Sequence, residues 1–362
     1  MGFHIAPNGA KIETRFGQPS GTGSDQGLLV RLRDLFNSVP GGGTIKGSIY
    51  TINLKYVSDA LYAAANRGVT LQIMQCRKDK VEGSTSPNGD NMVTVMASLP
   101  GQRWTGGAGD DATHKWGAIA SQDGADLHSK YFLLSQATGP DGVAYANVVI
   151  VTSANPSSWS GQQLSNDMQV IYGDATLYNN LLNGYHVPVW NEDHTYGVDF
   201  YEPPGRGKID SAYVNLYASP SATGDMWVNR LDDFNNDTNV EVYAAFGWLM
   251  AERQAVYDKL IAMKQAGAWV QVAAGKNYDT SVVQQLQGAG IAVKANLRMH
   301  NKSIIVSANG GAKKVVFAGS HNLNNQALRV NDELISRTHS VPGEYDDYKA
   351  HYDWLWANLS SA

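Results

Sequence analysis

Residues 127–135 read LHSKYFLLS and residues 299–307 read MHNKSIIVS, so a histidine and a lysine two positions apart open an apolar run twice in one chain. Apolar runs of this length are typical of buried strands, in which residues two positions apart face the same side. In each copy the histidine and the lysine are therefore expected to project together. The two pairs are His128 with Lys130 and His300 with Lys302.

A second short pattern follows each pair on the next apolar run. Residues 147–155 read NVVIVTSAN and residues 315–322 read VVFAGSHN, so both runs end in Ser-x-Asn. An Asn-Asp pair comes next in each copy and is extended by a glutamate in the second. The residues of interest are Ser153, Asn155 and Asp167 in the first copy and Ser320, Asn322, Asp332 and Glu333 in the second.

The surrounding sequence repeats in the same order. In the first half, helical spacing predicts helices over residues 27–36 and 56–66, and alternation predicts strands over residues 44–52 and 69–74. The second half repeats this series, with helices near 228–234 and 256–267 and strands over 239–249 and 269–272. Strands that alternate with helices indicate an α/β unit with a largely parallel or mixed sheet. Two such units in tandem predict two α/β lobes that pack with pseudo-twofold symmetry around one site.

We expect the N-terminal lobe to span residues 1–200 and the C-terminal lobe residues 201–362. Residues 184–207 contain Pro188, Pro203 and Pro204 without clean periodicity, and are predicted to connect the lobes. Residues 77–125 are rich in Gly, Ser and Asp and have a shorter counterpart in the second half. They are predicted to form an inserted loop region near the site.

The composition narrows the functional classes. The chain has 362 residues, of which 43% are hydrophobic, so it can bury a sizeable core, and wholesale disorder is excluded. Its net charge of -5 argues against a basic, non-specific nucleic-acid binder. The single cysteine, Cys76, excludes an intrachain disulfide and a cysteine-based zinc site, and is predicted to be a buried small residue. Little charge with much Gly, Tyr and Trp is typical of secreted bacterial enzymes, so we expect a secreted protein whose signal peptide has been removed.

Two copies of these motifs brought face to face would surround one cleft with paired functional groups. Two ammonium groups and two amides make an anion site suited to a phosphoryl group. Two imidazoles supply a nucleophile and a general acid, and each needs a partner to fix its tautomer. Asp167 and either Asp332 or Glu333 are the candidate partners. This inventory requires no metal, and no cofactor is expected.

These motifs resemble those of the phospholipase D superfamily, whose signature is H-x-K-x4-D followed by G-S-x-N, present twice. The resemblance covers nearly the whole chain and implies a metal-independent phosphodiesterase that works through a covalent phosphohistidine. It implies that His128 is the nucleophile and that His300 protonates the leaving alcohol. The remaining implied roles are phosphate binding by Lys130, Lys302, Asn155 and Asn322, support of the phosphate by Ser153 and Ser320, and orientation of the imidazoles by Asp167 and Glu333.

The chain departs from the family signature at one position of each motif. The aspartate five residues after the lysine is replaced by Ser135 in the first copy and by Ser307 in the second. A serine hydroxyl can hydrogen-bond backbone groups but cannot form an ion pair. The change is symmetric, which indicates a subfamily trait and leaves the catalytic groups intact.

The preferred function is a phospholipase D that releases the head-group alcohol and can transfer the phosphatidyl group to another alcohol. The alternatives are a nuclease of the superfamily and a phosphodiesterase for a soluble or polymeric diester such as a teichoic acid or a glycerophosphodiester. Tryptophans in loop-like segments, Trp104 and Trp190 among them, suit packing, a lipid-facing rim or a stacking platform, and these two are predicted to contact substrate. We expect transient contact with a membrane surface, no nucleic-acid partner and a monomer.

Overall fold

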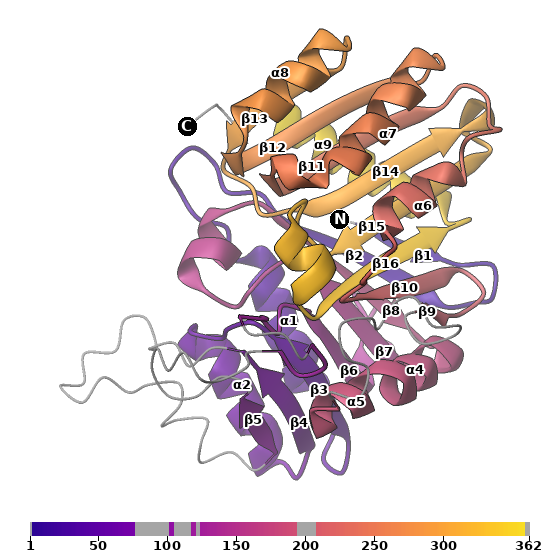
Figure 1. Cartoon of the computed structure of the whole chain (residues 1–362). Helices are drawn as coiled ribbons and strands as arrows, with labels where there is room; N and C mark the ends of the chain where they lie inside the picture. The colour runs from indigo at the N-terminus through magenta and orange to yellow at the C-terminus, as the bar shows by residue number, and fades with distance from the viewer. Residues whose placement is uncertain (1, 77–100, 105–116, 121–123, 194–207, 359–362) are drawn as a thin grey trace.

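The computed structural model describes residues 2–76, 101–104, 117–120, 124–193 and 208–358. Figure 1 shows the N-terminal half of the chain in its lower part and the C-terminal half in its upper part. Within the described residues, each half forms one mixed sheet of eight strands. The predicted α/β fold with two similar lobes is confirmed.

The first sheet has the strand order β1-β2-β8-β7-β6-β3-β4-β5. Strands β3, β4 and β5 run parallel, and the remaining neighbours pair antiparallel. The strands are β1 (Gly2–Ile5), β2 (Lys11–Gly17), β3 (Thr44–Ile49), β4 (Thr70–Gln75), β5 (Gln102–Trp104), β6 (Tyr131–Thr138), β7 (Ala144–Thr152) and β8 (Asn166–Tyr172).

Helices cover both faces of this sheet. Helices α1 (Gly27–Ser38) and α2 (Lys55–Asn66) place leucines, valines and alanines at helical spacing against one face. The other face packs on α4 (Ala175–Leu181), the short helix η2 (Leu182–His186) and α5 (Val187–Asn191), through Leu177, Tyr185 and Val189. The helix η1 (Ser158–Gln163) precedes β8 and lies beside the functional site.

The second sheet has the order β13-β12-β11-β14-β15-β16-β10-β9, which repeats the first sheet strand for strand. Strands β11, β12 and β13 again run parallel. The strands are β9 (Lys208–Asp210), β10 (Val214–Ser219), β11 (Glu241–Leu249), β12 (Trp269–Tyr278), β13 (Ala292–Leu297), β14 (Lys302–Ala308), β15 (Lys313–Gly319) and β16 (Glu333–His339).

The second sheet is also covered on both faces. One face packs on α6 (Met226–Asp232), α7 (Gln254–Gln265) and α8 (Thr280–Gly288), and the other on the C-terminal helix α9 (Pro342–Asn358). Short helices η4 (Ala251–Arg253), η5 (Asn309–Gly311) and η6 (Gln326–Val330) complete the half. The two sheets meet where β7 and β8 contact β15 and β16, and α9 also reaches β1 and β2 of the first half.

The predicted helices and strands of both halves are found within a few residues of their expected ends. One prediction is wrong, because the connection expected from residue 184 begins with helix. Pro188 occupies the first turn of α5, where a missing N–H costs nothing, and Tyr185 and Val189 are fully buried. The predicted boundary between residues 200 and 201 lies outside the described residues.

No helix in the described part of the chain combines the length and the apolar character needed to cross a bilayer.

Candidate active site

The first imidazole pairs with a carboxylate from the other half of the chain. His128 Nδ1 lies 2.8 Å and 2.9 Å from the two carboxylate oxygens of Glu333, at the start of β16. The hydroxyl of Ser320 donates to the same carboxylate. Burial raises the pKa of Glu333, and the nearby Lys130 ammonium opposes that rise. With Nδ1 occupied, Nε2 is the ring nitrogen of His128 that is available for chemistry.

The neighbouring carboxylate serves a different purpose. The two oxygens of Asp332 accept hydrogen bonds from the backbone N–H groups of Ala118, Ile119 and Ala120. These residues belong to the segment predicted to be an insertion near the site, most of which lies outside the described residues. The structure thus places Glu333 beside the imidazole, while Asp332 anchors the inserted segment.

The second imidazole is held by a neutral amide. His300 Nδ1 lies 3.1 Å from Asn166 Oδ1 and 3.1 Å from the backbone oxygen of Ser153. The predicted partner, Asp167, instead accepts a hydrogen bond from Asn301 Nδ2 at 2.8 Å, and burial raises the pKa of Asp167 to about 6. The prediction that Asp167 orients an imidazole is wrong, because successive residues of a strand face opposite sides and position 166 is the one that faces His300.

Reciprocal backbone bonds cross between the halves beside both histidines. The N–H of His128 donates to the backbone oxygen of Asp332 at 2.9 Å, and the N–H of His300 donates to the backbone oxygen of Ser165 at 2.7 Å. Asp332 and Ser165 occupy equivalent positions, each immediately before its final strand. These bonds hold the two histidine segments opposite each other across the pseudo-twofold axis.

Two buried lysines bond the backbone of the two histidines. Lys130 and Lys302 are both 0% exposed, and each ammonium donates to the backbone oxygen of its own histidine, at 2.6 Å and 2.5 Å respectively. Burial lowers the pKa of Lys130 to about 8, and the negative charge of Glu333 opposes the fall. Burial and the neighbouring Lys130 lower the pKa of Lys302 well below its ordinary value. The two ammonium groups repel each other, so an anion bound between them would stabilise both charges.

The same environment lowers the pKa of both histidines. Burial is the largest cause for each, and the two ammonium groups add to it. Both imidazoles are therefore neutral at pH 7 in the protein without substrate. A neutral imidazole is the form that a nucleophile requires.

The predicted serines and asparagines divide into two roles. Ser153 and Ser320 are fully buried and hold the residues next to the imidazoles: Ser153 Oγ lies 3.2 Å from Asn166 Oδ1, and Ser320 bonds Glu333. They do not line the cavity, so their predicted direct support of substrate is corrected to a positioning role. Asn155 and Asn322 do line it.

The two histidines line one cavity of about 500 Å³ at the junction of the halves. Besides His128, His300 and Asp126, its described lining has three aromatic rings, six amides and three hydroxyls. These are Tyr50, Trp159, Trp248, Asn53, Asn155, Asn322, Asn324, Asn331, Gln326, Thr51, Ser157 and Ser160. None of the described residues that line it is aliphatic, lysine or arginine. Tyr50 lies edge-on to His128, with ring centroids 5.3 Å apart.

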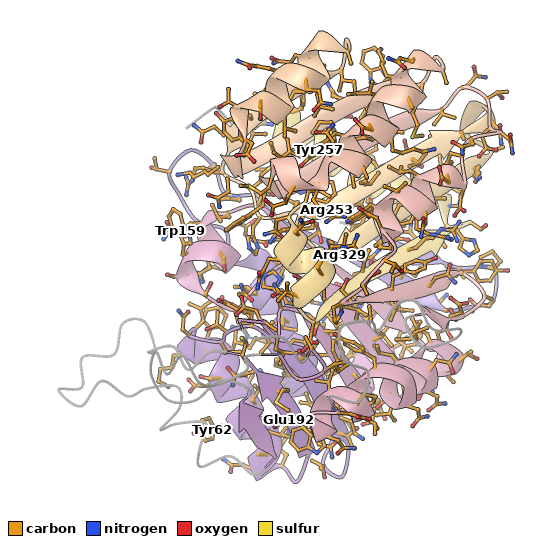
Figure 2. All side chains as sticks on the ribbon, in the orientation of Figure 1. Tyr62, Trp159, Glu192, Arg253, Tyr257 and Arg329 are labelled. Carbon is orange, nitrogen blue, oxygen red and sulfur yellow. The ribbon has the colours of Figure 1, made fainter. Side chains whose placement is uncertain are left out.

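The buried Arg253 on η4 fixes one wall of this cavity. Its guanidinium forms an ion pair with Asp225 at 2.8 Å and donates to the backbone oxygens of Asn322 and Asn324. Figure 2 shows Arg253 in the middle of the molecule, near the junction of the two halves. The sequence motifs gave no reason to select this residue or Tyr50 and Trp248.

Three other predicted positions lie away from the cavity. Trp190, in α5, stacks on His186 of η2, with ring centroids 6.4 Å apart. Trp190 is not among the residues that line the cavity, because it lies on the helical turn that contains Pro188. The backbone of Trp104 lies in β5, and its side chain is outside the described residues. Ser135, which replaces the signature aspartate, accepts a hydrogen bond from the N–H of Thr44 at the far end of β3, away from the histidines.

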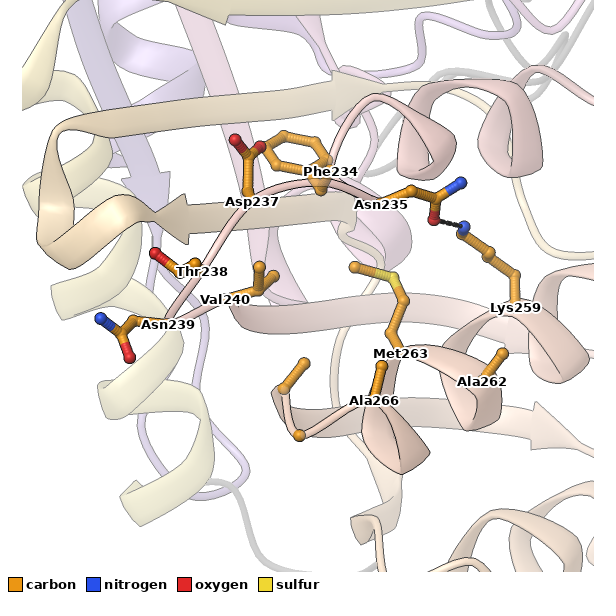
Figure 3. A pocket seen from close by; sticks show the side chains of 12 residues that line it. Phe234, Asn235, Asp237, Thr238, Asn239, Val240, Lys259, Ala262, Met263 and Ala266 are labelled. Carbon is orange, nitrogen blue, oxygen red and sulfur yellow. Dashed lines mark hydrogen bonds between the residues drawn. The ribbon is translucent and has the colours of Figure 1, made fainter.

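A second cavity lies at the opposite end of β11, between the loop 234–240 and the end of α7 (Figure 3). Its wall includes Lys259, whose ammonium bonds Asn235 and Asp232. It contains none of the motif residues. Among the described residues, no group of three or more His, Cys, Asp or Glu side chains is placed to hold a metal ion.

Comparison with known proteins agrees with the geometry. The family model described as "Cardiolipin synthase, PLD-like domain" matches residues 236–356, which contain the second motif. Phosphatidylserine synthase of Haemophilus influenzae Rd KW20 superposes with a TM-score of 0.61 over 99% of this chain and 89% of that chain, at 11% identity. Residues 236–356 are therefore similar to a phospholipase D-like domain, and the whole chain shares the fold of this synthase.

Two further solved structures have a fold similar to that of this chain. Yeast tyrosyl-DNA phosphodiesterase superposes with a TM-score of 0.51 at 11% identity, over 91% of this chain and 90% of that chain. Polyphosphate kinase from Porphyromonas gingivalis has a TM-score of 0.55 at 11% identity over 95% of this chain, which spans 50% of the length of that kinase. At such identities the likeness shows the fold alone. A comparison with curated protein sequences finds no match.

Proposed function

We propose that this protein is a phosphodiesterase of the phospholipase D type that forms a covalent phosphohistidine, and that a phospholipid is its substrate. One observation supports this chemistry most strongly. Two imidazoles from different halves, each with Nδ1 occupied, line one cavity, and a buried lysine bonds the backbone oxygen of each histidine. This set supplies a nucleophile, an acid and an anion site, which are the groups that diester cleavage requires.

The proposed reaction has two displacements at phosphorus. In the first, Nε2 of His128 forms a bond to phosphorus, the bond to the leaving oxygen breaks, and His300 gives that oxygen a proton. In the second, His300 takes a proton from water, the oxygen of water attacks phosphorus, and the bond to His128 breaks. An alcohol in place of water gives transphosphatidylation. Two in-line displacements retain configuration at phosphorus.

Lipid as the substrate is supported by the exposed tryptophans at the cavity mouth. Trp159 is 52% exposed and Trp248 is 38% exposed, and such rings suit a surface that is half apolar and half wet. We also propose an extracellular location, which is supported by composition alone.

The lining of the cavity favours one second candidate, a phosphodiesterase for a soluble, polar diester. Amides and hydroxyls dominate the described lining, and an acyl chain would meet no aliphatic side chain among those residues. A nuclease fits less well, because a nucleic acid needs cations for its neighbouring phosphates, and no lysine or arginine is among the described lining residues.

The test offers three substrates at matched phosphate concentration in the presence of EDTA. They are vesicles of mixed phospholipids, single- and double-stranded DNA, and a glycerophosphodiester. Phosphatidate formation that disappears in His128→Ala supports the proposal. The matched control is His4→Ala, because His4 forms another imidazole–carboxylate pair, with Asp347 at 2.7 Å, outside the cavity.

Cleavage of the soluble diester alone would select the second candidate, and cleavage of DNA alone would select the nuclease. Diester cleavage that persists in both His128→Ala and His300→Ala would contradict the mechanism for every substrate.

A further inference from the structure

Two tryptophans from different halves stand at the mouth of the active-site cavity. Trp159 lies on η1 of the first half, and Trp248 lies near the end of β11 in the second. Figure 2 shows Trp159 on its short helix at the outer edge, level with the junction of the two halves. Trp159 is 52% exposed and Trp248 is 38% exposed, so ring surface is available to a ligand.

The segment that carries Trp159 is tied directly to catalytic groups. The hydroxyl of the next residue, Ser160, accepts a hydrogen bond from Asn155 Nδ2 at 3.3 Å, and its backbone oxygen accepts one from Asn166 Nδ2 at 2.5 Å. Asn166 also contacts His300. Trp159 is thereby held at a defined place on the side of the cavity that belongs to the predicted general acid.

Trp248 lines the same side and lies next to an irregularity in the sheet. Between Phe246 and Trp248 the single residue Gly247 of β11 stands opposite two residues of β12, Gly275 and Lys276. Gly247 donates its N–H to the backbone oxygen of Asn301, and a Cβ at this position would lie 3.3 Å from the Cα of His300. A side chain here would have to displace the histidine segment.

The equivalent position in the first half carries a large ring. Strand pairing aligns Ser48 with Tyr131 and Ala245 with Ser303, so Tyr50 corresponds to Gly247. Tyr50 lies edge-on to His128, whereas Gly247 packs against the backbone of His300 and brings no ring to that position. The leaving alcohol, which His300 protonates, therefore meets Trp159 and Trp248 on this side and not a counterpart of Tyr50.

A cation lies close to one of the two tryptophans at the cavity mouth. The ammonium of Lys276, on β12, lies 5.6 Å from the ring centroid of Trp159. An indole face without such a partner attracts quaternary ammonium groups. Lys276 already lies beside the Trp159 ring, and its positive charge repels a second cation there.

Polar groups around the rings suit hydroxyls. The amides of Asn322, Asn324 and Gln326 and the hydroxyl of Thr51 line the same cavity. Neutral amides can donate and accept at once, which matches neighbouring hydroxyl groups, whereas a quaternary ammonium has no N–H or O–H to donate to them. The carboxylate of Asp126, which also lines the cavity, can accept a hydrogen bond from a hydroxyl. A site built to hydrogen-bond hydroxyls discriminates strongly against an alcohol that lacks them.

We infer that the leaving alcohol of this enzyme is an uncharged ring with several hydroxyl groups, a cyclitol or a hexose, that stacks against Trp159 and Trp248. This inference rests on the proposed function. The ring can belong to a lipid head group or to a soluble diester, since the cavity recognises the same chemistry in both.

The test compares inositol and choline esters in both forms: phosphatidylinositol with phosphatidylcholine in vesicles, and glycerophosphoinositol with glycerophosphocholine in solution. We expect kcat/KM for the inositol ester to exceed that for the choline ester by about tenfold or more. Trp248→Ala and Trp159→Ala should each lower this preference by about fivefold. Lys276→Gln should raise kcat/KM for the choline ester relative to the inositol ester.

The chain contains a matched control for these variants. Trp269 is 50% exposed, and Lys264 lies 5.5 Å from its ring, yet neither lines the cavity. Trp269→Ala and Lys264→Gln should leave the preference unchanged. Equal rates for the two alcohols, or a choline preference, would overturn the inference, and whichever source is cleaved identifies the lipid or the soluble form.

Binding separates this inference from the proposed function. Inositol 1-phosphate and phosphocholine are titrated into His128→Ala, with tryptophan fluorescence as the readout. Tighter binding of inositol 1-phosphate that weakens when Trp248→Ala is added supports the inference even if no diester is turned over. Equal binding of the two ligands would overturn it even if diesters are cleaved.

Discussion

Replacing Glu333 with glutamine tests whether the first imidazole needs a negative charge beside it. The substitution keeps the size of the side chain but removes the charge that lies 2.8 Å from His128 Nδ1. The new amide can also donate a hydrogen bond to Nδ1, which moves the ring proton to Nε2 and removes the lone pair that attacks phosphorus. Both effects act on formation of the phosphohistidine.

The expected loss follows from the position of the charge. A phosphorylated imidazole that keeps its Nδ1 proton is positive, and the Glu333 side chain is only 1% exposed, so water screens the pair weakly. Two unit charges about 4 Å apart at an effective dielectric constant of about 20 interact by about 4 kcal/mol. At about 1.4 kcal/mol for each tenfold change in rate, turnover should fall about a thousandfold.

The assay is the release of p-nitrophenol from bis(p-nitrophenyl) phosphate. This leaving group needs no proton from His300, so the rate reports attack by His128. The control is Glu344→Gln, since Glu344 is also 0% exposed but bonds Gln169 and no histidine. Turnover of Glu333→Gln within tenfold of the wild type, with an unchanged circular dichroism spectrum, would refute the reasoning.

Three further predictions follow from the same region and its surroundings. Because burial lowers the pKa of Lys130 to about 8, kcat/KM measured against pH should fall as the pH rises through about 8 and this ammonium loses its charge; a flat profile to pH 10 would contradict this. Asn166→Ala should slow diesters with alkyl leaving groups by about tenfold to a hundredfold, and p-nitrophenyl esters much less, because only the former need the proton that His300 supplies; equal losses for both would show a general defect. Burial raises the pKa of Glu344 from 4.5 to about 8, so the fold loses stability as the pH rises from 4.5 to about 8. Glu344→Gln should therefore exceed the wild type in free energy of unfolding by a margin that grows over this range to about 5 kcal/mol, and urea titrations at pH 5 and pH 9 that show equal margins would exclude this origin.

Patterns that repeat at fixed spacing could be predicted from the sequence. The pairs His128 with Lys130 and His300 with Lys302 stand where β6 and β14 begin, although only Lys302 lies inside its strand, because β6 starts at Tyr131 and β14 at Lys302. The identical strand order of the two sheets follows from the repeated helix–strand series. Buried strands and amphipathic helices impose strict periodicities on the sequence. When the same series of patterns occurs twice, each copy supports the assignment of helices and strands in the other.

The prediction of the residues that partner the imidazoles depended on how the two halves of the sequence were aligned with each other. Matching the two Asn-Asp pairs selected Asp167, whereas equal spacing selects Asn166, since 13 residues separate Ser153 from Asn166 and also Ser320 from Glu333. On a strand, an error of one residue places the side chain on the opposite face. Spacing from the preceding motif was the signal that could have found Asn166.

The cavity wall could not be predicted, because it depends on tertiary contacts without a local pattern. Trp248 lies beside an irregularity in the pairing of β11 with β12, and Arg253 acts through backbone oxygens that only the folded chain brings together. Trp190 had the same local features as Trp159, yet it packs on a neighbouring histidine. Residue type and loop-like context do not distinguish these outcomes.

The two histidines occupy equivalent places in the two halves but have different hydrogen-bond partners, so the two rings are suited to different roles. In the proposed mechanism, the negative charge of Glu333 beside His128 would stabilise the positive ring that transfer of phosphorus to this imidazole forms. His300 has only neutral partners, and Lys302 and Lys130 lower its pKa further after burial. A phosphodiester bound between the lysines brings a negative charge that offsets both ammonium groups, so it raises the pKa of His300 and lets that ring take up a proton. We infer that the acid becomes protonated when substrate binds, whereas the nucleophile is prepared by the protein itself.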